Sequence, residues 1–184
     1  MNHGLNKYKE NPEVFSICGY SNKVSVPKGY DYDAYFCPRS SSWGWATWKD
    51  RWEKCDWELK DWASVEHNRS AFNQWGGSDC FGMLCGWHKG RNMSWAIRFC
   101  YSQFLDNAVS LFPIISKVNN DGFDGNGTNC KKWSRFKSVF DDSDVKNFRL
   151  PANTIVLGKF RREVMRYNSI LLRAISKIMY LLYR

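Results

Sequence analysis

The 184-residue sequence has few of the residues from which metal sites and disulfide frameworks are built. It contains only three histidines, and its seven cysteines include no C-x-x-C pair. These spacings argue against the common zinc motifs, and an odd number of evenly spread cysteines predicts buried free thiols rather than disulfides. Free thiols are typical of a reducing compartment, so we expect a cytoplasmic protein.

Long apolar runs, internal repeats and low-complexity tracts are also absent from the sequence. No uninterrupted stretch reaches the roughly 18 apolar residues that a membrane-spanning helix needs. The length suits one domain or a large part of a bigger one. We therefore expect a globular chain that does not span a membrane.

Tryptophan and positive charge are present in excess. Ten tryptophans within a 17% aromatic content predict a binding surface as well as a core, because an indole can stack on a ligand and still donate a hydrogen bond. The formal net charge of +9 favours an anionic partner such as nucleic acid, membrane lipid or nucleotide phosphate. Residues 160–184 hold six Lys or Arg and one Glu, which is more than half of the excess.

The amino-terminal end shows a helical stripe from its first residue. Met1, Leu5 and Tyr8 recur at helical spacing with no capping signal before them. From this we expect that a preceding piece of protein is missing. A short native amino-terminal helix is the alternative.

The carboxy-terminal end has helical period from residue 160 to residue 184. Its basic residues share one face and its apolar residues the other, which is typical of a helix that lies on an anionic membrane surface. We expect such peripheral binding on the inner face of the membrane, with packing of the helix on its own domain as an equally open alternative. The basic face holds Arg162, Arg166, Arg173, Lys177 and Arg184, and the apolar face holds Val164, Leu171, Ile175, Ile178 and Leu182.

The middle of the chain has the alternating pattern of an α/β fold. Strands are expected at 14–19, 31–38 and 111–118, the last either at an edge of the sheet or irregular, because Pro113 cannot donate a ladder hydrogen bond. Helices are expected at 43–62, 79–88 and 94–105, and a loop at 70–77. Residues 118–130 are rich in glycine and asparagine, which predicts a mobile lid.

Two segments of the chain resemble a known family: SSSWGWATWKDRWEKCDW, and NMSWAIRFCYSQFL with the following DNAVSLFPIISKVNNDGFDGNGTNC. They are similar to the carboxy-terminal half of bacterial family 2-like glycosyltransferases of the GT-A fold, as found in capsule and lipopolysaccharide gene clusters. The resemblance covers roughly residues 10 to 130 of the chain. It implies an enzyme that transfers a sugar from a nucleotide-sugar donor to a saccharide or lipid-linked acceptor.

The resemblance also implies a Rossmann-like amino-terminal half that binds the nucleotide and holds Mn²⁺ or Mg²⁺ through a D-x-D-type motif. That half is not found in the sequence, since Asp31 and Asp33 form a D-x-D only after a Pro-Lys-Gly turn, and no metal ligand is assigned in this chain. We expect residues 1–150 to be the acceptor-side part of a GT-A domain, followed by a linker and a basic amphipathic helix at 151–184. Catalysis is then expected to need the missing half.

The first motif supplies candidates for an acceptor site. A sugar has apolar C–H faces and a rim of hydroxyls, so an indole beside small hydroxyl groups suits it. Ser41, Ser42, Trp43 and Trp45 have that composition and are expected to bind substrate. For the two indoles, packing in the core is the alternative.

The candidate catalytic base is Asp79, which follows two glycines and a serine at the start of an expected helix. Such a carboxylate would be fixed by the turn, and relatives of the pattern commonly carry an acid at this position; an ordinary helix N-cap is the alternative. Trp95 and Arg98 are also expected to bind substrate, with Arg98 reaching a phosphate or Asp79, or else forming a surface salt bridge. Asp124 is expected in the lid over the donor.

Two other classes of function compete with the transferase. A nucleic-acid-binding module would interleave aromatic and basic residues, but residues 40–62 hold six tryptophans with nearly balanced charge while the basic tail has none. No nucleic-acid partner is therefore expected. A non-catalytic, membrane-associated protein would use only the terminal helix and leave the glycine-asparagine loop without a purpose.

Overall fold

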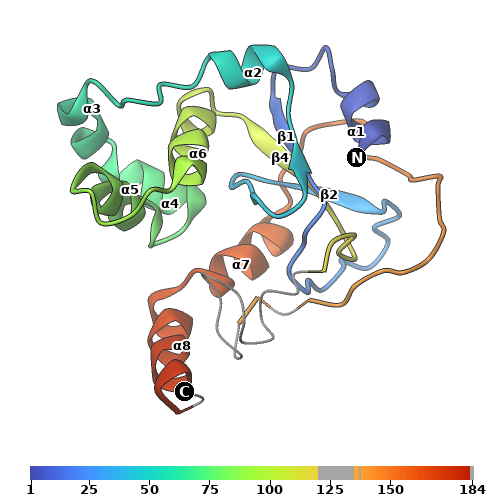
Figure 1. The fold of residues 1–184 in the computed structure, drawn as a ribbon. Helices are drawn as coiled ribbons and strands as arrows, with labels where there is room; N and C mark the ends of the chain where they lie inside the picture. The colour runs from blue at the N-terminus through green and yellow to red at the C-terminus, as the bar shows by residue number, and fades with distance from the viewer. Residues whose placement is uncertain (120–134, 137, 183–184) are drawn as a thin grey trace.

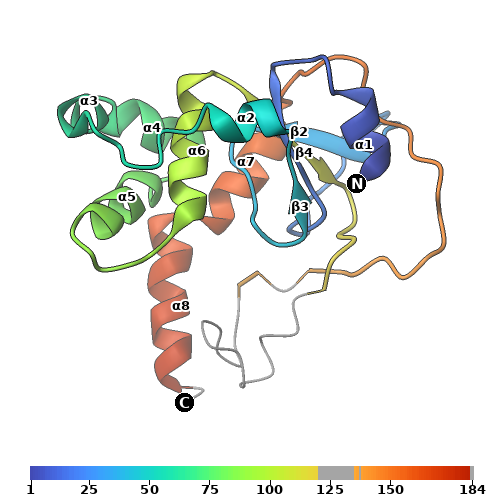
Figure 2. The same cartoon turned by 45° about the horizontal axis from the view of Figure 1, so that its top comes forward.

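The computed structural model describes residues 1–119, 135–136 and 138–182. Its centre is a mixed sheet with the strand order β2-β4-β1-β3 (Figure 1 and Figure 2). Strand β4 runs parallel to β1 and antiparallel to β2, and β3 pairs antiparallel with β1. The predicted α/β class is confirmed. The strands are β1 (Val14–Cys18), β2 (Ala34–Cys37), β3 (Trp45–Ala46) and β4 (Val109–Pro113).

Helices surround this sheet on both faces and form a separate layer beside it (Figure 1). Among the described residues, no helix is both long enough and apolar enough to cross a membrane. The helices are α1 (Asn2–Lys7), α2 (Lys49–Glu53), α3 (Trp62–His67), α4 (Arg69–Gly76), α5 (Cys80–His88), α6 (Trp95–Leu105), α7 (Gly158–Tyr167) and α8 (Ile170–Leu182).

The two faces of the sheet are covered by opposite ends of the chain. On β2, Tyr35 stacks on Phe160 of α7 with ring centroids 4.4 Å apart, while Phe36 points the other way and meets Tyr8 edge-on at 5.5 Å. Side chains alternate across a strand, so a strand with apolar residues at every position must be buried on both faces. All four residues of β2 are buried, and α7 therefore belongs to the core of the domain.

Helices α4, α5 and α6 pack on one another beside the sheet. Their shared core contains Phe72, Leu84, Ile97 and Tyr101, all at most 3% exposed. Phe99 of α6 contacts Phe15 of β1, with 4.9 Å between ring centroids, and so joins this layer to the sheet. Helix α6 begins after Ser94, whose hydroxyl accepts a hydrogen bond from the backbone N–H of Ile97.

The helix expected at 43–62 is wrong over most of its length. Trp45 lies in β3, helix α2 covers only residues 49–53, and the chain then turns through Leu59, which has a φ of 45°. Trp45 from the strand and Trp52 from the short helix nevertheless reach the same aromatic cluster, where their rings lie 6.1 Å apart. The loop expected at 70–77 is also wrong, since residues 69–76 form α4 and Phe72 is fully buried.

Two further expectations are corrected by the tertiary structure. Strand β4 is internal rather than at an edge, because Pro113 is its last residue and leaves the ladder before it intact. The carboxy-terminal helix is two helices rather than one. The break follows Asn168, whose side-chain amide donates to the carbonyl of Val164, and α8 restarts after Ser169, whose hydroxyl accepts from the N–H of Leu172.

Candidate functional site

A cavity of about 280 Å³ opens where the chain leaves β2 and passes between α5, α6 and α7. This volume lies near the lower end of the usual range for small-molecule sites, roughly 300–1,000 Å³. Its wall combines the run from Arg39 to Trp43 with the first turn of α6 and with Asn168 at the end of α7. The cavity is thus built from segments that are far apart in the sequence.

The serine run and one indole form the polar side of this cavity. Ser41, Ser42 and Trp43 all line it. The Trp43 ring is held edge-on by Tyr20 at 4.6 Å and by Phe136 at 5.8 Å between centroids. This support leaves the indole half-buried, which suits a ring that both packs and meets a ligand.

A buried thiol fixes the backbone of the serine run. Cys18 of β1 donates from its Sγ to the carbonyl of Ser41 and accepts from the N–H of Ser41 at 3.3 Å. Burial raises the pKa of the Cys18 thiol to about 12, so the group keeps its proton and can act as a donor near neutral pH. The position of Ser41 is therefore set by the sheet itself.

Gly44 lets the chain turn directly after Trp43. It has a φ of 53°, and a Cβ at this position would lie 2.4 Å from Cγ2 of Val118. Only glycine fits both the left-handed backbone and the available space. This turn sends the next residue, Trp45, into β3 and away from the cavity.

An ion pair adjoins the cavity wall. Arg39 lines the cavity, and its guanidinium binds both carboxylate oxygens of Asp79, with Nη1–Oδ1 at 2.8 Å and Nη2–Oδ2 at 3.1 Å. Burial acts to lower the pKa of Arg39, but neighbouring groups, Cys80 and Asp79 among them, outweigh it and raise that pKa above its usual range. Arg39 therefore stays charged beside the cavity.

Asp79 occupies the N-cap position of α5 without acting as a cap. Its side chain makes no capping hydrogen bond and instead accepts hydrogen bonds from Arg39. Asp79 is 7% exposed and is not itself part of the cavity wall. The turn before it depends on Gly77, which has a φ of 123° and lies close to Asp79 and Asn168.

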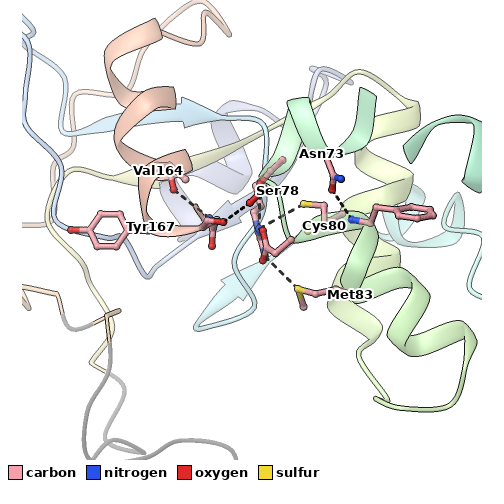
Figure 3. Close-up of polar contacts among 12 residues, drawn as sticks. Asn73, Ser78, Cys80, Met83, Val164 and Tyr167 are labelled. Carbon is pink, nitrogen blue, oxygen red and sulfur yellow. Dashed lines mark hydrogen bonds and ion pairs between the residues drawn. The ribbon is translucent and has the colours of Figure 1, made fainter. Parts of the chain in front are cut away.

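The break between α7 and α8 is anchored to this same turn. Ser78 donates a hydrogen bond from its hydroxyl to the carbonyl of Asn168 at 3.0 Å. Figure 3 shows Ser78 and Cys80 on the α5 side of this junction, facing the end of α7 that carries Val164 and Tyr167. The cavity, the ion pair and the helix break are thus connected through hydrogen bonds and shared residues.

Trp45, Trp95 and Arg98 lie together in a different place. The indoles of Trp45 and Trp95 are 5.0 Å apart, within an aromatic cluster that includes Phe99. Arg98 donates to the carbonyl of Trp57, and its guanidinium carbon lies 4.6 Å from the centre of the Trp87 ring. These residues line none of the cavity, so the structure brings only Ser41, Ser42 and Trp43 of the expected substrate-binding residues together there.

The remaining site expectations concern the lid and the metal. Asp124 and most of the glycine-asparagine loop lie outside the described residues. Asp33 accepts a hydrogen bond from the backbone N–H of Arg149 at 2.7 Å. Within the described part of the chain, no group of three or more His, Cys, Asp or Glu side chains is placed to hold a metal ion.

Arg39 was not among the residues expected at the site, and neither were Asn22, Ser94 and Asn168. Arg39 follows the apolar strand β2 in the run YFCPRSSSW, where charged and hydroxyl residues replace apolar ones in a single step. Polar residues at the end of a buried strand are a common position for ligand contacts in α/β folds. This change of composition is the sequence feature that could have indicated Arg39 as a site residue.

Comparisons with family models, with curated proteins and with solved structures find no match to this chain.

Proposed function

We propose that this chain is the acceptor-side part of a GT-A-type glycosyltransferase, which transfers a sugar from a nucleotide-sugar donor to a saccharide or lipid-linked acceptor. The observation that carries the proposal is the composition of the cavity wall, where Ser41 and Ser42 lie beside the indole of Trp43. The divalent cation that the resemblance implies would be held outside the described residues.

The cavity supports a carbohydrate because it offers both kinds of contact that a sugar ring needs. The Trp43 indole supplies a flat apolar surface for a C–H face, and hydroxyl and amide groups can bond the hydroxyl rim. Asn22, Ser94 and Asn168 add such groups from three other segments of the wall. The volume of about 280 Å³ suits a single sugar residue rather than a long chain.

In the proposed reaction, the acceptor hydroxyl oxygen forms a bond to the anomeric carbon of the donor sugar. The bond from that carbon to the diphosphate oxygen breaks, and its electron pair leaves with the diphosphate. Asp79 is the proposed acceptor of the hydroxyl proton, because this carboxylate is bonded directly to a residue of the cavity wall. Each carboxylate oxygen has a lone pair beyond the one that Arg39 uses.

Arg39 has a positioning role in this proposal. Its two bonds fix the plane of the Asp79 carboxylate, and its carbon chain and guanidinium form part of the wall. A fixed carboxylate needs no reorganisation when it takes the proton, and such preorganisation is a main source of catalytic rate.

Saccharide binding tests the first part of the proposal and requires no donor. Saturation-transfer NMR with a panel of mono- and disaccharides is expected to detect binding that Trp43→Ala abolishes. Trp45→Ala is the matched control, because its indole is two residues away, is also half-buried, and lies outside the cavity. Loss of binding in both folded variants, or in neither, would remove Trp43 from the acceptor site.

Turnover tests the second part, in the longer protein that the proposal implies. With a nucleoside diphosphate sugar and Mn²⁺, Asp79→Asn is expected to lower the rate of donor consumption by about 10²–10⁴-fold, as for loss of a general base. Saccharide binding should persist in the same variant. Unchanged turnover would exclude Asp79 as the base, and joint loss of binding and fold would assign it a structural role only.

A further inference from the structure

Helix α8 exposes a continuous apolar surface. Six of its large apolar side chains are exposed, although each is of a kind usually found in a core. The exposed fractions are 70% for Ile170 and Leu171, 38% for Ile175, 58% for Ile178, 70% for Leu181 and 71% for Leu182. We call these six residues, together with the exposed Ala174, the apolar face of α8.

The helix is attached to the rest of the fold along a different side. Ser176 is 1% exposed, donates to the carbonyl of Leu172 and accepts a hydrogen bond from Nη1 of Arg135 at 3.3 Å. In both views α8 extends away from the sheet and from the helical layer (Figure 1 and Figure 2). Of the apolar face expected from the sequence, Val164 in α7 is packed on the domain, whereas Leu171, Ile175, Ile178 and Leu182 in α8 are exposed.

The apolar face is bordered by positive charge. At about 100° per residue, its seven members fall within roughly 140° of the helix circumference, and Lys177 and then Arg173 follow at one edge. No Asp or Glu occurs from Val164 to Leu182. Neither Arg173 nor Lys177 has an acidic partner in the described part of the chain.

Helix α7 also has exposed basic residues, but its apolar residues are packed on the domain. Arg162 and Arg166 are exposed, whereas its apolar residues Phe160 and Val164 are buried on the sheet side. Helix α7 thus anchors the pair of helices to the core, and α8 carries the free apolar surface.

We propose that α8 docks on an anionic lipid bilayer, with its apolar face in the interfacial region and Lys177 and Arg173 at the headgroups. Charge complementarity selects this occupant, because long basic side chains beside an apolar stripe can reach lipid phosphates while their carbon stems stay in the apolar layer. A second copy of the chain is a poorer occupant, because it would bring two cationic helices together and their like charges would repel. The docking needs no substrate and is independent of the proposed sugar transfer.

Docking would also fix the orientation of the cavity relative to the lipid. Asn168 is part of the cavity wall and lies two residues before the start of α8. Its carbonyl is bonded to Ser78 at the start of α5. A bilayer that holds α8 therefore holds the cavity at the membrane surface.

Vesicle co-sedimentation of the whole chain tests the proposal. One vesicle preparation is phosphatidylcholine alone, and the other is phosphatidylcholine mixed with an equal part of phosphatidylglycerol. We expect strong binding to the mixed vesicles and weak binding to phosphatidylcholine. Arg173→Glu with Lys177→Glu should lower the affinity for the mixed vesicles by at least about 25-fold. Leu171→Gln with Ile178→Gln should abolish binding to both.

Matched controls separate α8 from the rest of the surface. Lys9→Glu with Lys49→Glu changes net charge equally at residues that are 70% and 86% exposed, near α1 and α2 at the opposite end of the fold (Figure 1). Val145→Gln with Ile155→Gln removes two exposed apolar side chains elsewhere. Both controls should bind as the unchanged protein does, with circular dichroism showing the same fold for every variant.

Three results would overturn the proposal. The first is equal binding to both vesicle types, and the second is equal loss in the α8 charge variant and its control. The third is a concentration-dependent dimer in light scattering that Leu171→Gln with Ile178→Gln dissociates, in the absence of vesicle binding, which would assign the apolar face to a second copy of the chain.

Discussion

Arg39 and Asp79 are 40 residues apart in the sequence and form a two-point ion pair in the fold, with Nη1–Oδ1 at 2.8 Å and Nη2–Oδ2 at 3.1 Å. The side chains are only 17% and 8% exposed. The pair connects the end of β2 to the start of α5, and so joins the sheet to the helical layer beside the cavity. Its energetic role can be measured separately from any catalytic one.

Removal of the acid should destabilise the fold strongly. Asp79→Ala leaves a largely buried guanidinium without its counter-charge, which is expected to lower the free energy of unfolding by about 3–5 kcal/mol. Urea denaturation measures this change. The control is Glu53→Ala, whose partner Lys49 is 86% exposed, and which should cost less than about 1 kcal/mol. Equal costs for the two variants would show that the Arg39–Asp79 pair contributes no more than a surface pair.

Gly77 is expected to be irreplaceable, unlike a glycine a few residues later. Its φ of 123° is unfavourable for any L side chain, and a Cβ there would lie 3.0 Å from Oδ1 of Asp79. Gly77→Ala should therefore lower the free energy of unfolding by about 1–3 kcal/mol. Gly82→Ala, inside α5 with open space around its Cβ position, should instead raise it by about 0.5–1 kcal/mol. Thermal and urea unfolding of both variants would check the opposite signs.

Stability should decline in alkaline solution because of buried thiols. Burial is the main cause that raises the pKa of Cys18, Cys37 and Cys80 to about 12 each, from an ordinary value of 9.0. Between these values the unfolded chain loses thiol protons that the folded chain keeps, so the unfolded state is favoured as pH rises. The stability is fully present below pH 9 and is lost progressively toward pH 12.

The slope of this decline identifies a single thiol. For each such group, the free energy of unfolding should fall by about 1.4 kcal/mol per pH unit within the alkaline window. Cys37→Ala removes one of these thiols and should make the slope of the free energy of unfolding against pH shallower by that amount. The variant should also be less stable at every pH, because it loses some packing. Urea titrations at a series of alkaline pH values give the comparison, and parallel slopes for the variant and the unchanged protein would contradict the assignment.

Elements with a strong local pattern were predictable from the sequence. Residues 14–19 and 31–38 contain strands β1 and β2, and residues 79–88 and 94–105 contain helices α5 and α6. Each of these segments contains a short run of mostly apolar residues, and α6 also has a clear boundary residue in Ser94. Local propensity and tertiary packing agree in such segments, so pattern alone is sufficient.

The candidate site was predictable only in composition. Ser41, Ser42 and Trp43 lie on the cavity, but the equally promising Trp45 does not, because the left-handed turn at Gly44 directs it into the cluster around Phe99. The partner of Asp79 could not be inferred either. Arg39 and Arg98 are both basic residues near aromatic motifs, and only the position of the segment after β2 beside the start of α5 decides which of them meets the acid.

By itself, the sequence determined the mixture of strands and helices, the presence of free thiols and the separation of basic from apolar residues near the carboxy terminus. These properties follow from composition and from periods of two or of about 3.6 residues, which are local. The tertiary structure alone decided that Asp79 binds Arg39, that only one of two neighbouring indoles faces the cavity, and that the apolar face of α8 stays exposed. Each of these depends on which distant segments come together in space, and no local period encodes that information.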